Sequence, residues 1–443
     1  MAQQREGAWS EARAEGRLRS LELFGMRFGL DRMRRMMTAL DSPERAYETI
    51  QVLGTNGKTS TTRFTAAILE RHGLRTGAYT SPHLTAYRER ILIGERELDA
   101  PSFSAAIARA DRAAEQVNRT LAEDDHVTQF ELLTAAALWE MARREVQVGV
   151  VEAGLGGRYD ATSVVQAGVT VLTNVGLEHT RWLGPTISDI AEEKLAVVRP
   201  GATLVLGEGL APEALAVAER IAAEREARIV LPRPLPADLQ LRSRGPFQRR
   251  NLAVARSAAE AHLRLAGIEL DEQAVIDAAG ATAVPGRLQI VAEQPLTVLD
   301  SAHNPDAVAA LVEAMGEVFA GTPPALVLGV LEDKDAAGML RQLLPLCART
   351  WFTAPPSSRA LSPAALQSRA RQLGFTETTC EPRAERALEA AREWAAGHGA
   401  GVLATGSVYL VGELMARLGE APASFGEGGE EPSAARREGS ARR

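Results

Sequence analysis

The sequence predicts an α/β protein made of parallel-rich sheets covered by helices. Short apolar segments alternate with alanine-rich segments of helical periodicity along most of the chain. Several apolar segments lack polar alternation, as expected for strands that are buried on both faces. Near Pro285 and Gly286 a complete helix ends and a fresh strand-helix series begins. We therefore expect two domains, a larger one over residues 1–284 and a smaller one over residues 285–425.

The individual elements follow from this alternation. Predicted strands cover 50–53, 146–151, 169–173, 203–206, 297–299, 325–329 and 401–404. Predicted helices cover 63–72, 103–118, 132–144, 188–198, 251–266, 305–318 and 384–396. Residues 426–443 are rich in Gly, Glu, Ser and Arg, which predicts a disordered tail.

Composition excludes several classes of protein. The chain has 443 residues, 45% of them hydrophobic, and a formal net charge of −7, so no general basic surface indicates a nucleic-acid partner. No apolar run approaches the roughly 18 residues of a membrane span. Cys347 and Cys380 cannot form a disulfide framework and lack metal-ligand spacing. These features predict a soluble, cytoplasmic enzyme that binds neither nucleic acid nor a membrane.

The most informative segment is a glycine turn between a predicted strand and a helix. It contains Gly54 and Gly57 and continues with Lys58, Thr59 and Ser60. Backbone N–H groups of such a turn, the start of the helix and the lysine together bind phosphate, and one of the two hydroxyls suits Mg²⁺. The full phosphate-loop pattern asks for a further glycine, where Val52 stands, so a simple helix cap is the alternative.

Polar residues after later strands predict a metal site beside this turn. Glu152 ends one strand, and His179 follows the next, so both belong at one sheet edge. A carboxylate suits Mg²⁺, while a histidine ligand also admits Mn²⁺. The alternatives are a capping carboxylate and a structural histidine. Ser81 offers a hydroxyl in another turn, and Lys194 on the following helix reads equally well as a solvated lysine.

The second half repeats this arrangement. A strand ends at Asp300, a polar turn carries His303 and Asn304, and Pro305 begins a helix. Asp300 can accept a hydrogen bond from a ribose or an adenine amine, and its alternative role is a helix cap.

Six motifs in order resemble the folylpolyglutamate synthase/dihydrofolate synthase family of the Mur ligase superfamily, from about Gly29 to Met415. They are Gly-Thr-Asn-Gly-Lys at 54–58, Thr-Ser-Pro-His-Leu at 80–84, Glu-Ala-Gly-Leu-Gly-Gly-Arg-Tyr-Asp-Ala-Thr at 152–162, Leu-Glu-His-Thr-Arg-Trp-Leu-Gly at 177–184, Pro-Gly-Arg-Leu-Gln at 285–289 and Asp-Ser-Ala-His-Asn-Pro at 300–305. The resemblance implies an N-terminal phosphate-loop ATPase domain and a C-terminal Rossmann-like domain. It also implies a monomer that uses ATP to join L-glutamate to a pteroate or folate through an acyl phosphate.

The resemblance also implies roles for particular residues. Those expected to bind ATP are Thr55, Asn56, Gly57, Lys58, Thr59, Ser60, Asn251, Arg287, Asp300 and His303. Those expected to bind one or two Mg²⁺ ions are Ser81, Glu152, His179 and Lys194, the last as a carbamate, and Lys58, His179 and Lys194 are the expected catalytic residues. Those expected to bind the pteroate or folate are Gly29, Leu30, Asp31, Thr128, Phe130 and Glu131. Because ATP contacts come from both domains, we expect the domains to close around the nucleotide.

Two departures and two rival functions remain. Thr59 replaces the family's second glycine, which leaves open whether Thr59 or Ser60 meets the metal, and Glu178 stands where an aspartate is common. A peptidoglycan-building Mur ligase is disfavoured because only 53 residues precede Gly54, fewer than its additional domain needs. A regulatory ATPase would leave Arg287 and the 300–305 motif unexplained. Residues 127–131 favour a bifunctional enzyme, although Thr128 and Glu131 also fit a helix capping box.

Overall fold

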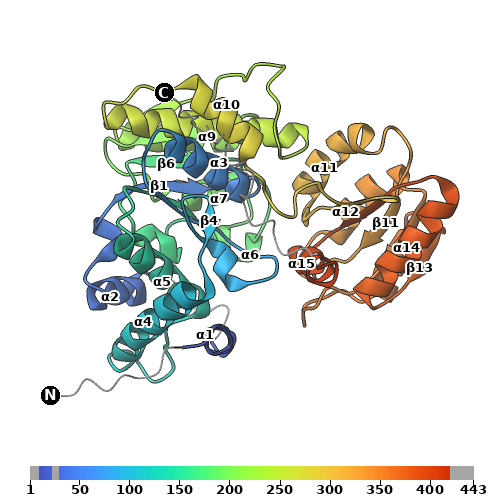
Figure 1. Ribbon diagram of the computed structural model, residues 1–443, viewed down its shortest axis with the longest axis horizontal. Helices are drawn as coiled ribbons and strands as arrows, with labels where there is room; N and C mark the ends of the chain where they lie inside the picture. Colours follow the sequence, from blue (N-terminus) through green and yellow to red (C-terminus); the bar gives the residue numbers. More distant parts are fainter. Residues whose placement is uncertain (1–8, 22–28, 420–443) are drawn as a thin grey trace, which may run out of the picture.

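The computed structural model describes residues 9–21 and 29–419, and the predicted tail lies outside these residues. Two sheets, each flanked by helices, form two lobes that lie side by side (Figure 1). The predicted α/β class is confirmed.

The first sheet has eight strands in the order β4-β3-β2-β5-β1-β6-β7-β8, parallel from β2 to β8 and antiparallel at β3 and β4. Its strands are β1 (Glu48–Leu53), β2 (Thr76–Tyr79), β3 (Ile91–Ile93), β4 (Arg96–Glu97), β5 (Val148–Glu152), β6 (Val169–Leu172), β7 (Thr203–Leu206) and β8 (Arg228–Val230). Strands β2, β5, β1 and β6 are neighbours, so their carboxyl ends meet at one edge of the sheet.

The second sheet has six strands in the order β13-β12-β11-β14-β10-β9, of which only β9 is antiparallel. Its strands are β9 (Gln289–Glu293), β10 (Leu296–Leu299), β11 (Ala325–Leu328), β12 (Arg349–Phe352), β13 (Thr378–Cys380) and β14 (Val402–Thr405). The carboxyl end of β10 carries the turn that begins at Asp300.

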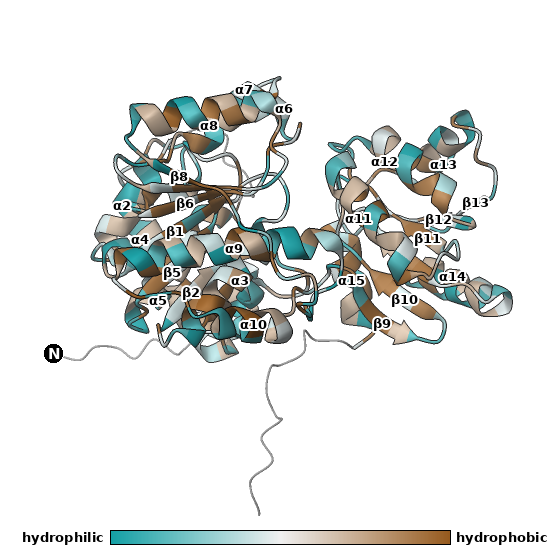
Figure 2. Ribbon diagram, turned by 90° about the horizontal axis from the view of Figure 1, so that it is seen from above, coloured by the Kyte–Doolittle hydropathy of each residue, from teal (hydrophilic) through white to brown (hydrophobic). Residues whose placement is uncertain are grey.

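Helices cover both faces of each sheet, and the apolar strands lie between them (Figure 2). The helices are α1 (Glu11–Arg19), α2 (Asp31–Ala39), α3 (Lys58–Arg71), α4 (Ala100–Asn118), α5 (Gln129–Arg143), α6 (Thr180–Leu183), α7 (Ile187–Leu195), α8 (Pro212–Glu224), α9 (Pro246–Leu265), α10 (Glu272–Ala281), α11 (Pro305–Val318), α12 (Ala336–Leu343), α13 (Pro363–Gln372), α14 (Ala384–His398) and α15 (Val408–Arg417). Short 3-10 turns are η1 (Pro43–Arg45), η2 (Tyr87–Arg90), η3 (Ala161–Val164) and η4 (Leu344–Leu346). Helix α3 packs against α9 and α10 on one face of the first sheet, while α4 and α5 pack together in a separate core cluster.

Every predicted strand and helix corresponds to an observed element, but the predicted start of the helix after the glycine turn was wrong, and this boundary belongs to the functional site. The predicted helix began at residue 63, whereas α3 begins at Lys58 directly after the glycine turn. The run Lys-Thr-Ser-Thr-Thr has weak helix propensity, and packing against α9 overrides it. The first turn of α3 thereby brings its free N–H groups to the sheet edge. Among the described residues, no helix is long and apolar enough to cross a membrane.

Candidate functional site

A cavity of 870 Å³ lies between the two domains and is lined by residues of both. Its N-terminal wall is formed by the turns that follow β1, β2, β5 and β6, and its C-terminal wall by the turn after β10. All six residues from Thr55 to Ser60 line this cavity. The predicted phosphate loop therefore opens into a cleft large enough for a small ligand.

The glycines of the loop are required by close packing. A Cβ atom on Gly54, whose φ is +146°, would lie 1.9 Å from the Thr173 hydroxyl. A Cβ atom on Gly57, with φ +82°, would lie 2.5 Å from the side-chain oxygen of Asn251 on α9. Both positions therefore favour glycine, because any other residue would be strained in its backbone and would displace a neighbouring side chain. Asn251 thus lies directly against the loop, as its predicted ATP role requires.

The residues after β6 hold the loop from the other side. The side-chain oxygen of Asn174 accepts hydrogen bonds from the backbone N–H of Asn56 (2.7 Å) and of Thr55 (3.1 Å). The Thr173 hydroxyl donates to the Asn56 carbonyl at 2.6 Å. These contacts fix the loop before any ligand binds, which preorganises the remaining N–H groups.

Glu152 is a buried carboxylate surrounded by neutral donors. It is 1% exposed, and it accepts hydrogen bonds from the Thr59 hydroxyl (3.0 and 3.1 Å) and from the backbone N–H of Ser81 (3.1 Å). Burial raises the pKa of this carboxyl to about 7, against the opposing charge of Lys58. The structure thus places the Thr59 hydroxyl on this carboxylate, while Ser60 is buried in α3.

Two lysines approach the same loop. Lys58 donates to the carbonyls of Gly54 and Thr55, both at 3.1 Å. Lys194 is 4% exposed, donates to the Gly54 carbonyl at 2.9 Å, and does not line the cavity itself. Burial, followed by the charge of Lys58, lowers the pKa of Lys194 to about 7. The alternative of a solvated surface lysine is therefore wrong for Lys194.

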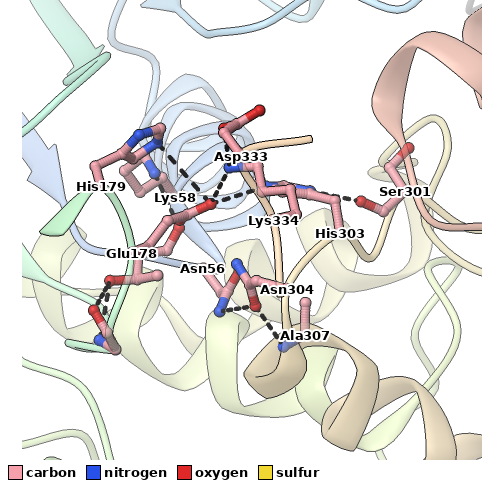
Figure 3. A network of polar contacts seen from close by, with 12 residues as sticks. Asn56, Lys58, Glu178, His179, Ser301, His303, Asn304, Ala307, Asp333 and Lys334 are labelled. Carbon is pink, nitrogen blue, oxygen red and sulfur yellow. Dashed lines mark hydrogen bonds and ion pairs between the residues drawn. The ribbon is translucent and has the colours of Figure 1, made fainter. Parts of the chain in front are cut away.

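His179 and Glu178 both line the cavity and belong to the network of polar contacts in Figure 3. His179 has a left-handed φ of +54° and precedes α6. Burial first, and then the charge of Lys334, lower the pKa of His179 to about 4, so the ring is neutral at pH 7 and able to bind a metal. Burial alone would raise the pKa of Glu178, but His303 and Lys334 outweigh it and hold that pKa well below its usual range.

The C-terminal wall is organised by Asp300, which is 3% exposed. Its two oxygens accept hydrogen bonds from the backbone N–H of Leu288 (2.9 Å) and of Ala302 (2.8 Å). Burial raises its pKa, against the charge of Arg287. The alternative of a helix cap is wrong, because Asn304 caps α11. Asp300, Arg287 and His303 all line the cavity.

The predicted pteroate-binding residues fall into two groups. Gly29, Thr128, Phe130 and Glu131 line the large cavity. Thr128 and Glu131 also form the capping box that begins α5, so the capping-box interpretation is confirmed, while their role in substrate binding stays a prediction.

The structure does not bring Leu30 and Asp31 to this cavity. Leu30 lines a separate cavity of 570 Å³. Asp31 forms an ion pair at 2.8 Å with Arg35, one turn further along α2.

Several residues of the site were not recognised in the sequence. Asn174 carries no motif signal of its own, although it directly follows a predicted strand at the correct edge. Arg32 is buried and binds both oxygens of Glu131, at 2.9 and 3.0 Å. In the sequence, Lys334 is one of four consecutive charged residues, 332–335, that come shortly after a predicted strand. For both Asn174 and Lys334, the sequence signal that could have identified them is their position shortly after a predicted parallel strand.

This fold and cleft are those of a Mur-type ligase. The sequence matches the Mur ligase middle domain over residues 52–205 and the glutamate ligase domain of Mur ligases over residues 286–408. It is 31% identical over 437 residues to the dihydrofolate synthase/folylpolyglutamate synthase of Bacillus subtilis (strain 168), covering 93% of this chain and 99% of that protein. The chain therefore belongs to the dihydrofolate synthase/folylpolyglutamate synthase family, which confirms the resemblance drawn from its motifs.

Solved structures agree with this assignment. A Mycobacterium tuberculosis folylpolyglutamate synthase complexed with ADP has a TM-score of 0.86 and 29% identity, covering 93% of this chain and 99% of that one. Escherichia coli FolC in complex with DHPP and ADP has a TM-score of 0.79 and 28% identity, covering 93% and 98% of the two chains.

Proposed function

We propose that this protein is an ATP-dependent ligase that joins the amine of L-glutamate to the carboxylate of dihydropteroate and of tetrahydrofolate, as a bifunctional dihydrofolate synthase/folylpolyglutamate synthase. The observation that carries the proposal is one cleft in which a phosphate loop, the buried Glu152 and the Asp300 turn meet, in a chain of this family. Residues 1–284 form its ATP-binding domain and residues 285–425 its C-terminal ligase domain.

The chemistry follows from the poor reactivity of a carboxylate. A carboxylate oxygen attacks the γ-phosphorus of ATP, the bond to ADP breaks, and an acyl phosphate forms. The glutamate amine then attacks the acyl carbon, phosphate leaves with the bonding electrons, and the amine loses a proton to solvent. The loop N–H groups and Lys58 hold the phosphates, while Asn251, Arg287, Asp300 and His303 hold the rest of the nucleotide. Catalysis is therefore positioning and electrostatics.

The residues present fit Mg²⁺. The described residues contain no group of three or more His, Cys, Asp and Glu that could hold a metal ion by themselves. Mg²⁺, however, needs only one or two carboxylates together with substrate phosphates. Glu152 and the hydroxyls of Ser81 and Thr59 would supply oxygen ligands, and neutral His179 would add a nitrogen that also suits Mn²⁺. Mg²⁺, when bound with ATP, neutralises charge on the transferring phosphoryl group.

Lys194 is suited to carbamylation. Its pKa of about 7 leaves a large share of neutral amine at physiological pH. A neutral amine attacks CO₂ to form an N–C bond and loses one proton, which turns a buried cation into an anion. The resulting carbamate would be an anion beside the phosphate loop and could help to hold a metal ion there.

The pteroate end of the substrate binds on the α5 side of the cleft. Phe130 offers an aromatic face, and its ring centroid lies 6.1 Å from that of Tyr79. Gly154 makes room for this ring, since a Cβ there would lie 2.5 Å from it. Arg32 and Thr128 fix the Glu131 carboxylate beside it.

The test is product formation followed by mass spectrometry. The protein receives ATP, Mg²⁺ and glutamate with either 7,8-dihydropteroate or tetrahydrofolate, and ADP release is measured in parallel. We expect one glutamate on dihydropteroate and further glutamates on tetrahydrofolate. Addition of glutamate to tetrahydrofolate alone would indicate an enzyme that extends the glutamate chain and does not make dihydrofolate. ATP turnover without glutamate addition to either would overturn the proposal in favour of a peptidoglycan-type or regulatory function.

A further inference from the structure

The two domains are joined beside the cleft by an ion pair that is largely shielded from solvent. The Lys334 ammonium, after β11, lies 2.6 Å from Glu178 Oε1, after β6. The Nε2 atom of His303, before α11, lies 3.5 Å from the same oxygen. The two partners of the ion pair are only 11% and 9% exposed at their side chains. We call Glu178, His303 and Lys334 the clamp (Figure 3).

A second contact joins the phosphate loop itself to the C-terminal domain. The side-chain amides of Asn56 and Asn304 donate to each other, at 3.2 and 3.0 Å. Asn304 is fixed in turn, because its oxygen also accepts from the Ala307 N–H at the start of α11. The position of α11 and the position of the loop are therefore coupled through one pair of side chains.

Close backbone approach shows that this junction is tight. A Cβ on Gly176 would lie 2.0 Å from the Asp306 carboxylate of α11. The segment 174–179 therefore touches the loop through Asn174, the C-terminal domain through Gly176 and the clamp through Glu178. A change at Glu178 is therefore expected to alter the distance between the phosphate loop and the C-terminal domain.

We propose that Glu178 is a positioning residue, whose carboxylate binds Lys334 and His303 and thereby sets the distance between the phosphate loop and the C-terminal wall. The kinetic consequence rests on the proposed ligase function, whereas the structural consequence does not. A closed cleft places Arg287 and Asp300 opposite the loop, and ligation needs both walls on one nucleotide.

Another ion pair between the domains provides the matched control. Arg250 on α9 and Glu313 on α11 lie 2.7 Å apart, but their side chains are 42% and 46% exposed. Exposed pairs contribute little, whereas Glu178→Gln would leave the shielded Lys334 ammonium with only the more distant carboxylate of Asp333, at 3.5 Å. Arg250 lines the cavity but Glu313 does not, so Glu313→Gln removes an interdomain charge without replacing a cavity-lining side chain.

The experiment measures the wild type, Glu178→Gln, the double variant Glu178→Gln/Lys334→Met, and Glu313→Gln. Small-angle X-ray scattering of the nucleotide-free proteins gives the radius of gyration, thermal unfolding gives stability, and steady-state kinetics give kcat and KM for ATP. We expect a larger radius for Glu178→Gln and a loss of about 10- to 100-fold in kcat/KM, the size expected for a displaced wall. Glu313→Gln should match the wild type in all three.

The double variant separates positioning from folding. It leaves no unpaired buried charge, so its thermal midpoint should return towards that of the wild type, while its radius and kcat/KM should stay altered. A wild-type radius in both clamp variants would overturn the proposal, as would recovery of radius and kcat/KM in the double variant. If the wild type added no glutamate, the radius would still decide the question, so this outcome is distinct from failure of the proposed function.

Discussion

Glu152, the last residue of β5, and Glu178, after β6, are carboxylates shielded from solvent at the ends of the two strands that flank β1, yet their surroundings are opposite. Glu152 receives only neutral donors, and burial raises its pKa to about 7. Glu178 receives the ammonium of Lys334 from the other domain, and its pKa falls. The difference shows that one sheet edge carries two kinds of acid. One accepts hydrogen bonds from neutral donors, whereas the other is paired with a cation supplied by the C-terminal domain.

The largest effect should come from removing the charge at the first of these acids. Glu152→Gln keeps the size of the side chain, so the fold should persist, but it removes the carboxylate proposed to hold the metal. We expect glutamate addition to fall by at least about 100- to 1000-fold, with an unchanged radius of gyration. Mass spectrometry of the products measures this loss, and full activity would remove Glu152 from the site.

A somewhat smaller loss of activity is expected when Lys58, whose charge opposes the rise in the pKa of Glu152, is replaced. Lys58→Met removes a charge proposed to hold the ATP phosphates and leaves the clamp untouched. We expect glutamate addition to fall by about 100-fold and ATP to bind more weakly by calorimetry. The same measurements on Glu178→Gln should give a smaller kinetic loss. Equal losses of activity in the two variants would contradict the distinction between Lys58 as a phosphate-binding residue and Glu178 as a positioning residue.

The pH dependence of stability sharpens the comparison further. The folded protein binds the Glu152 proton more tightly than the unfolded chain, because the pKa rises from 4.5 to about 7. This stabilisation is complete below pH 4.5 and is lost as the pH rises through 7. Relative to the wild type, Glu152→Gln should therefore gain thermal stability between these pH values and keep a constant advantage above them. Thermal unfolding of the nucleotide-free proteins tests this, and a difference that does not vary with pH would contradict it.

The smallest effect is expected at the exposed interdomain pair. Glu313→Gln should change the free energy of unfolding by less than about 1 kcal/mol, because solvent screens a pair that is nearly half exposed. Denaturant titration measures the change. A loss comparable to that of Glu178→Gln would mean that burial does not distinguish the two pairs.

Local sequence was sufficient to predict the N-terminal wall of the cleft, but it predicted the other parts of the fold and the site less completely. The turn at Gly54 and Gly57 and the strand end at Glu152 were predicted correctly, because φ preferences and apolar runs are local properties. The start of α3 was misplaced because packing overrode weak helix propensity. Leu30 and Asp31 were assigned by resemblance to a substrate segment, but Leu30 lines the separate cavity and Asp31 pairs with Arg35.

The sequence by itself determined the α/β class, the phosphate loop and the family, because each depends on short segments whose chemistry is readable in place. Only the tertiary structure decided how these segments work together. Strand order placed β5 and β6 on either side of β1. Domain packing brought together Asn56 and Asn304, which are 248 positions apart, and Glu178 and Lys334, which are 156 apart. Contacts at such separations depend on the path of the whole chain, and the charge that reaches a buried carboxylate decides its protonation.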